Sequence, residues 1–112
     1  MRRDRERLLD ILEAIEKIQK YAAYGRERFN DDELIQTWVV HHIQLIGEAA
    51  AGLSEESRKE YPEIPWSAIV NMRNILVHAY FKIDLPEVWN SVENDLPVLK
   101  AQLQSMLESE TD

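Results

Sequence analysis

The segment "RLLDILEAIEKI", residues 7–18, shows the pattern from which the fold of this chain is predicted. Its apolar residues recur at intervals of three and four, the spacing that places side chains on one side of an α-helix. Continued along the chain, this apolar stripe consists of Leu8, Leu12, Ile15, Ile18 and Ala22. Gly25 is predicted to end the helix, because glycine is common just after a helix C-terminus. We therefore expect a long amphipathic helix with one buried face.

A second amphipathic helix is predicted after a polar turn. The residues "NDDE", at 30–33, supply side chains that cap a helix N-terminus and the negative charge that a helix dipole favours there. The apolar stripe of this helix consists of Ile35, Trp38, His42, Leu45, Ala49 and Leu53. Two long helices are thus expected before residue 54.

The segment "SEESRKEYPEIPW", residues 54–66, is predicted to be a connector. Ser54, followed three residues later by Ser57, can cap a single short turn. Pro62 and Pro65 prevent that turn from continuing as a helix, because proline lacks the backbone N–H. Pro65 suits the first turn of a third helix, over roughly residues 65–80.

A fourth helix is expected to begin near Asp84, with Pro86 in its first turn and a kink at Pro97. Its apolar stripe consists of Val88, Trp89, Val92, Leu96, Leu99, Leu103 and Met106. The chain shows no alternating pattern typical of a β-strand and no internal repeat. Residues 1–112 are therefore predicted to form one all-α domain, an up-and-down four-helix bundle with a short extra turn between helices 2 and 3.

The composition is that of a soluble globular protein, with 45% hydrophobic and 30% charged residues in a chain of 112. The absence of cysteine excludes a disulfide framework and a thiolate zinc site. No apolar run approaches the length of about 18 residues that a membrane span needs. Acidic residues interrupt the N-terminal segment where a signal peptide needs an apolar run, so a cytoplasmic protein is expected.

The net charge of −8 argues against a protein that coats nucleic acid through a broad basic face. The charge is uneven, however. Residues 1–28 hold eight Arg and Lys against six Asp and Glu, net +2, while residues 29–112 hold five against fifteen, net −10. Any contact with RNA would be local, and a basic partner is as compatible with the sequence as an anionic one.

The predicted third helix contains "MRNILVHAYF", residues 72–81, in which polar side chains interrupt the aliphatic ones. At about 100° per residue, one face is apolar and is predicted to face the core: Ala68, Ile69, Met72, Ile75, Leu76 and Ala79. The other face mixes apolar with hydrogen-bonding side chains: Val70, Arg73, Asn74, Val77, His78, Tyr80 and Phe81. Because this second face lacks Glu and Lys, we expect it to be partly dry and partly a cleft. A two-fold homodimer would give such a face its partner.

Two interpretations of Arg73 and His78 follow from this face. In a dimer, two copies of each would meet in one cavity, where histidine passes protons and arginine stabilises the charge on a phosphodiester. A base near the 2′-hydroxyl of RNA is then enough to start attack on the adjacent phosphate, so neither a metal nor a cofactor is needed. Alternatively, the two residues are an ion-paired arginine and a buried, hydrogen-bonded histidine.

Several residues of the second helix bear on the same region. His41 and His42 point about 100° apart, unlike the i, i+4 pair that holds a metal, so no metal site is predicted. His42 is expected to be buried, and His41 to reach the dimer cleft. Gly47 inside a helix predicts close approach of another backbone. Glu48 is predicted to form an ion pair with Arg73, in a structural or a site-orienting role.

The segment "RNILVHAY" has Arg, four residues, His, one residue and Tyr, and it resembles the signature of the HepT-like toxins in the HEPN superfamily. The segments "RLLDILEAIEKI", "LIGEAA", "YPEIPW" and "NDLPVLK" resemble that family in the same order, over nearly the whole chain. Many members have an aspartate where this chain has Ala79, and arginine and asparagine often stand at the positions of His41 and His42.

The resemblance implies a compact helical homodimer that cleaves RNA at the dimer cleft without metal or cofactor. It also implies an antitoxin partner, MntA, which is a minimal nucleotidyltransferase. Arg73 and His78 carry over as catalytic residues, Asn74 as their neighbour, and Tyr80 as the tyrosine that the antitoxin adenylylates. A second hypothesis is a non-catalytic helical module that binds the nucleotidyltransferase and presents a substrate to it.

Overall fold

The structure, a computed structural model, describes residues 2–78 and 83–110. Regular structure in these two ranges is helical throughout, which confirms the all-α class. None of the helices in them is long and apolar enough to cross a membrane. The elements are α1 (Arg2–Ala22), α2 (Arg26–Asp31), α3 (Glu33–Ala51), α4 (Glu55–Glu60), α5 (Trp66–His78), α6 (Leu85–Asn90), the π-helix η2 (Ser91–Asp95) and α7 (Leu96–Glu110).

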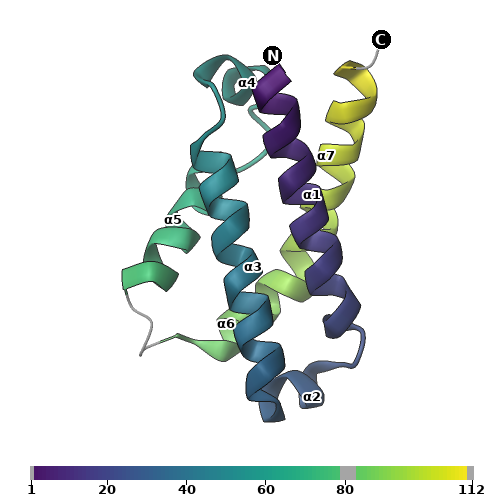
Figure 1. The fold of residues 1–112 in the computed structure, drawn as a ribbon, viewed down its shortest axis with the longest axis vertical. Helices are drawn as coiled ribbons and strands as arrows, with labels where there is room; N and C mark the ends of the chain where they lie inside the picture. Colours follow the sequence, from purple (N-terminus) through teal and green to yellow (C-terminus); the bar gives the residue numbers. More distant parts are fainter. Residues whose placement is uncertain (1, 79–82, 111–112) are drawn as a thin grey trace.

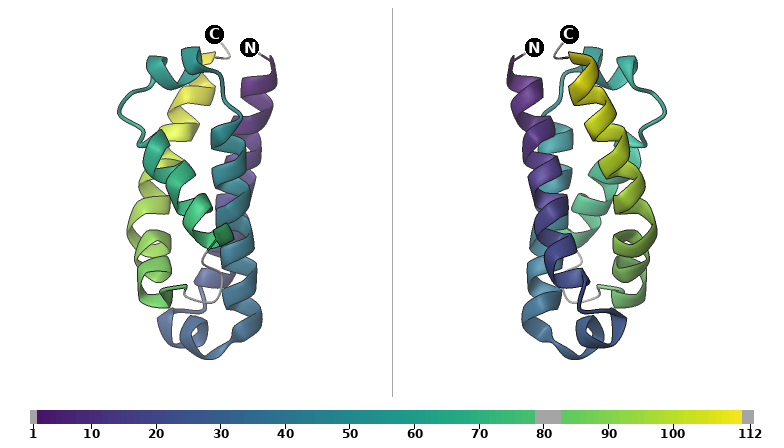
Figure 2. Two further views of the ribbon diagram at one scale, coloured as in Figure 1. Left: turned by 90° about the vertical axis from the view of Figure 1, so that its left-hand side faces the viewer. Right: turned by 90° about the vertical axis from the view of Figure 1, so that its right-hand side faces the viewer.

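The long helix α3 is central to the arrangement (Figures 1 and 2). It packs against α1 on one side and against α5 on the other, while α7 packs on α1. Segments α6, η2 and α7 follow one another along the outside of the bundle (Figure 1). Helix α5 packs chiefly on α3, whereas α7 packs on α1. The bundle is therefore open between α5 and the α6–η2–α7 segment.

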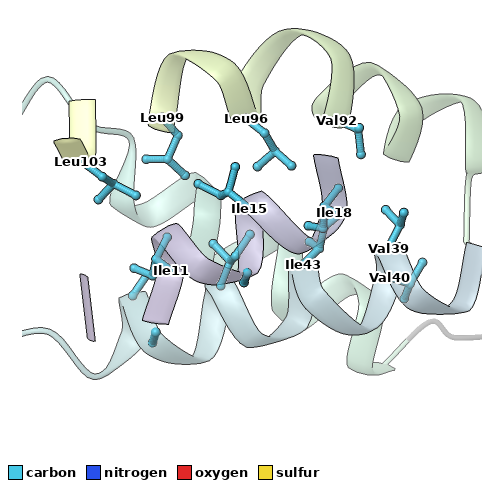
Figure 3. Packing of buried hydrophobic residues seen from close by; sticks show 14 of the residues in the cluster. Ile11, Ile15, Ile18, Val39, Val40, Ile43, Val92, Leu96, Leu99 and Leu103 are labelled. Atoms are coloured by element: carbon cyan, nitrogen blue, oxygen red, sulfur yellow. The ribbon is translucent and has the colours of Figure 1, made fainter. Parts of the chain in front are cut away.

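The core lies between α1, α3 and the η2–α7 segment (Figure 3). Buried side chains from these elements include Ile11, Ile15, Ile18, Val39, Ile43, Val92, Leu96, Leu99 and Leu103. Burial of each aliphatic side chain contributes about 1.5–3 kcal/mol relative to exposure. The predicted stripes of the first and fourth helices are thus largely confirmed.

The predicted stripe of α3 is only partly right. Its members Ile35, His42 and Ala49 are buried, but Trp38 and Leu45 are exposed. Because α3 packs against α1 and α5 at once, it buries two sides of the helix rather than one. Additional buried residues of α3 are Val39, Val40, Ile43, Ile46 and Ala50.

The predicted capping residues are confirmed. Asp32 accepts hydrogen bonds from the backbone N–H groups of Leu34 and Ile35, at 3.0 and 3.3 Å, at the start of α3. Ser54 accepts one from the N–H of Ser57 at 3.2 Å and caps α4. The side chain of Asp84 caps α6 in the same way.

Two local features differ from the sequence-based expectation. The polar turn after α1 contains the short helix α2, because Phe29 turns inward and packs on Trp89 with ring centroids 5.3 Å apart. Before Pro97 the helix widens into η2, where the N–H of Leu96 donates to the carbonyl of Ser91, five residues back. Proline removes one backbone donor, and a π-helical turn accommodates that loss.

Asp4 joins the start of α1 to the connector, a contact that the sequence pattern did not predict. The buried carboxylate accepts hydrogen bonds from the N–H and hydroxyl of Ser54 and from the hydroxyl of Ser57, at 3.1, 2.6 and 2.7 Å. The bond from the Ser54 hydroxyl is the main reason that the pKa of Asp4 lies below its usual 3.8; burial opposes it, and Ser57 adds to it.

We expect Asp4→Asn to lower the free energy of unfolding by about 1.5–3 kcal/mol, because the hydrogen bonds to a charged acceptor are lost. A folded-state pKa below the unfolded value stabilises the fold above pH 3.8, and this stabilisation is lost as pH falls through the lower folded value. Urea titrations at several pH values measure both effects, with the exposed Asp10→Asn as control. Equal stability of the two variants would contradict this role.

Candidate functional site

Gly47 and Arg73 are in direct contact where α3 and α5 meet. A Cβ added at Gly47 would overlap Arg73 Cβ, lie 2.8 Å from Arg73 Cγ and lie 3.3 Å from Arg73 Cα. Such distances leave no room for a side chain, so the glycine is required by the close approach of the two helices. The prediction made for Gly47 is confirmed, and the backbone that approaches it is that of Arg73.

This contact sets the rotation of α5 about its axis and corrects the predicted core face. Leu76 is buried, and Ile69 and Met72 are half-buried against the core. Ile75, however, is 52% exposed, and Ala68 is exposed as well. Ile75 lies two residues after Arg73, about 200° around the helix, so it faces away when Arg73 lies against α3. The assignment of these two residues to the core was wrong.

The guanidinium of Arg73 forms no ion pair or hydrogen bond with the residues that the structure describes. The side chain is half-buried, and its Nε is buried without a hydrogen bond. Arg58, the other arginine with a buried unpartnered Nε, still donates from Nη2 to the carbonyls of Ala51 and Leu53, at 2.8 and 3.2 Å. Within the described residues Arg73 makes no comparable bond. A buried polar atom without a hydrogen-bond partner is costly for stability, so the Nε of Arg73 is a candidate for a functional role.

The predicted ion pair between Glu48 and Arg73 is absent from the described residues of the chain. Glu48 follows Gly47 by one residue, about 100° around α3, and therefore points toward α1 rather than α5. It is exposed and lines a hollow of about 330 Å³ between α1 and α3, together with Arg7 and Lys17. Within one chain, the predicted pairing was wrong because the residue that faces Arg73 is the glycine.

Of the other predicted site residues, Asn74 is exposed beside Arg73 on α5. His78 is the last residue of α5, five positions after Arg73, and its side chain lies outside what the structure describes. At about 1.5 Å per residue, the two Cα positions are separated by roughly 7.5 Å along the helix axis. Tyr80 lies outside the described residues.

The two adjacent histidines of α3 have different environments. His42 is buried, with Nδ1 2.7 Å from the carbonyl oxygen of Trp38 and its ring 4.4 Å from the Trp38 ring, as predicted for a satisfied buried histidine. His41 is exposed and lines a hollow of about 370 Å³ with Thr37 and Gln44 of α3 and Ile83 before α6. No group of three or more His, Asp and Glu side chains suited to a metal ion occurs in the described ranges.

The open side of the bundle forms a larger groove, of about 530 Å³. Ile43 and Ile46 of α3 lie in it, with Met72 of α5 on one side and Leu99 of α7 on the other. The helix that carries Arg73 packs chiefly on α3, and its exposed residues, among them Asn71, Asn74 and Ile75, are available to another molecule.

The fold and the site together define a small helical protein in which one helix presents an unpaired arginine ahead of a histidine. A family model described as "Ribonuclease HepT-like" matches residues 11–106. The chain belongs to this family, as its resemblance in the motif region implied.

Two relatives illustrate the similarity. A "Probable ribonuclease HepT" of Thermococcus cleftensis is 35% identical over 106 residues, covering 94% of this chain and 96% of the relative. The "Putative RNase MJ1380" of Methanocaldococcus jannaschii is 32% identical over 98 residues, covering 87% and 90%. No solved structure matches the chain.

We expect Gly47→Ala to lower the free energy of unfolding by about 2 kcal/mol, since overpacking against the Arg73 backbone outweighs the helix propensity gained. Gly52→Ala is the matched control. There, the atoms nearest to an added Cβ belong to the guanidinium group of Arg7, with Nε at 2.8 Å, and this flexible side chain can move aside. The free energy of unfolding should therefore change by no more than about 0.5 kcal/mol. Chemical denaturation measures both, and equal stability of the two variants would refute a tight contact at Gly47.

Proposed function

We propose that this chain is the toxin component of a toxin–antitoxin pair, a metal-independent endoribonuclease that acts at a homodimer cleft. The observation that carries this proposal is Arg73: a half-buried side chain whose Nε has no hydrogen-bond partner among the described residues, held against α3 at Gly47. Membership of the HepT-like ribonuclease family and the names of the relatives support RNA as substrate.

In the proposed reaction the 2′-hydroxyl of RNA attacks the adjacent phosphorus. The new bond joins the 2′-oxygen to phosphorus, the bond from phosphorus to the 5′-oxygen breaks, and a 2′,3′-cyclic phosphate forms. One His78 removes the proton of the 2′-hydroxyl, and a second supplies a proton to the leaving oxygen. Arg73 binds the phosphate and stabilises the charge that builds on it.

The need for two histidines is met by a dimer that contributes one His78 from each chain. Its interface is proposed along α5, where Ile75 is exposed between Asn71 and Asn74. Asn74 lies about 100° around α5 from both Ile75 and Arg73, so a two-fold axis there covers the isoleucines and leaves the two arginines at the edge of the interface, where we propose the cleft. Asn74 then lies beside the phosphate.

Purified protein is expected to cut RNA in the presence of EDTA and to leave a 2′,3′-cyclic phosphate or its hydrolysis product. His78→Ala should reduce the rate by about 10²–10⁴-fold, the usual range for loss of acid–base catalysis. Arg73→Ala should also be impaired, with Arg73→Lys in between because a lysine keeps the charge but not the planar fork.

The exposed Lys59→Ala serves as control and should cleave at the wild-type rate. Full activity of both Arg73→Ala and His78→Ala, or loss of cleavage in EDTA, would overturn the proposed mechanism.

The alternative function is a non-catalytic module that binds a nucleotidyltransferase, and the net charge of −10 over residues 29–112 favours it. Expression of the chain alone separates the two functions. A toxin arrests growth and His78→Ala relieves the arrest, whereas a binding module has no such effect.

Regulation by adenylylation of Tyr80 is the second part of the proposal. A minimal nucleotidyltransferase similar to MntA would transfer AMP from ATP in the presence of Mg²⁺. The Tyr80 hydroxyl loses its proton to solvent and its oxygen forms a bond to the α-phosphorus, while the bond from the α-phosphorus to the bridging oxygen breaks and pyrophosphate leaves. The position two residues after His78 supports this assignment. The added phosphate repels the RNA backbone, and the nucleotide occupies its path, so binding and catalysis stop together.

With the cognate nucleotidyltransferase, ATP and Mg²⁺, intact mass spectrometry should show increments of one or more AMP units that are absent in Tyr80→Phe. Tyr24→Phe is the matched control, because Tyr24 is exposed and distant in sequence. Tyr80→Phe should remain a toxic ribonuclease that the partner no longer silences. Modification that persists in Tyr80→Phe would exclude this residue as the acceptor.

A further inference from the structure

A row of aromatic rings crosses from the end of α1 to α3, away from α5. Tyr24 packs on Tyr21 with ring centroids 6.3 Å apart, and Tyr21 meets Trp38 edge-on at 5.2 Å. Trp38 stacks on His42 at 4.4 Å, and its indole N–H donates to the carbonyl of Lys17 at 2.9 Å. The end of α1, α2 and the beginning of α3 meet at one end of the bundle (Figures 1 and 2).

Cationic side chains lie over these rings. Lys20 Nζ is 5.7 Å from the centre of the Tyr21 ring, and Arg28 Cζ is 5.5 Å from that of Tyr24. We call Lys20, Tyr21, Tyr24, Arg28 and Trp38 the aromatic–basic strip.

The strip is exposed and locally positive in an acidic protein. The Tyr24 side chain is 63% exposed and that of Trp38 36%. Residues 17–28 hold four basic side chains, at positions 17, 20, 26 and 28, against one acidic side chain, Glu27. Arg28 is paired with Asp32 and Lys17 with Glu13, but Lys20 and Arg26 form no ion pair within the described residues.

Further contacts connect the strip with the region where α5 ends. The His42 ring meets that of His41 at 5.1 Å. His41 in turn lines a hollow together with Gln44 of α3, Ile83 and Leu85 at the start of α6. A chain bound in a cleft at the end of α5 would therefore reach the strip by crossing the outer surface of α3.

We infer that the aromatic–basic strip binds single-stranded RNA outside the cleft. This inference rests on the proposed function and extends it to the flanking nucleotides. Bases stack on Tyr24 and Trp38, while Lys20 and Arg26 contact the phosphates between them. Stacking and phosphate contacts read no base edges, so binding along the strip is tolerant of sequence. The alternation of aromatic rings and cationic side chains favours RNA over an acidic protein as the ligand, because an acidic protein would need only the cationic side chains.

Binding is tested apart from cleavage with a fluorescein-labelled 2′-O-methyl oligouridylate of about 12 nucleotides, within the range of site sizes known for single strands. Without a 2′-hydroxyl this probe cannot undergo the proposed reaction. Fluorescence anisotropy with the full chain should give an affinity that Tyr24→Leu weakens by about fivefold or more, because one stacking surface is lost. Tyr24→Phe retains the ring and should bind as the wild type does.

The charge contribution is measured by salt dependence. Lys20→Gln should reduce the slope of log Kd against log salt concentration by about 0.7, the value for one phosphate contact on a single strand. Lys59→Gln, which removes an exposed charge on α4, should leave affinity and slope unchanged.

The inference is overturned if the wild type does not bind the probe, or if Tyr24→Leu binds it as tightly as Tyr24→Phe. Binding of an acidic peptide in place of the probe would likewise reject it. If the wild type cleaves ordinary RNA but Tyr24→Leu binds the probe as tightly as the wild type does, the proposed function is retained and the strip is rejected. Probe binding that depends on Tyr24, with no cleavage of ordinary RNA, would support the strip and reject the ribonuclease.

Discussion

The contact between Gly47 and Arg73 determines how α5 is placed, and the candidate site depends on it. Since α3 presents no side chain at this position, the backbone of α5 approaches closely and the Arg73 stem lies on α3. A glycine also offers no carboxylate, and Arg73 Nε has no hydrogen-bond partner among the described residues. A single small residue thus fixes the position of the arginine, whose charge is available to a phosphate in the proposed function.

The same contact leaves the bundle open. With Arg73 on α3, Ile75 faces outward, and α5 forms few contacts with the α6–η2–α7 segment. Most of the core comes from α1, α3 and the η2–α7 segment, and α5 adds Trp66 and Leu76 to it. The exposed side of α5 is therefore the part of this helix that is free to form an interface. An exposed isoleucine among asparagines is the surface that a second copy would cover in the proposed dimer.

Sequence periodicity predicted the features that depend on local spacing. The amphipathic stripes of the long helices, the caps at Asp32 and Ser54, and the close approach at Gly47 all follow from residue types at short range. Features that depend on tertiary neighbours were not predicted. The rotation of α5, which exposes Ile75, is set by a contact with a helix more than twenty residues earlier. The direction of Glu48 and the burial of Asp4 under the connector also depend on partners that a single helix pattern does not reveal.

The central claim is that α5 completes its site with a second copy of the chain, and light scattering tests it most directly. At micromolar concentration the protein should have about twice the 13.2 kDa mass of one chain. Ile75→Lys, at a side chain that is already 52% exposed, should give a folded monomer, whereas Val98→Lys, at one 58% exposed on α7, should remain a dimer. A wild-type mass of 13.2 kDa, or a dimer that persists in Ile75→Lys, would contradict the account.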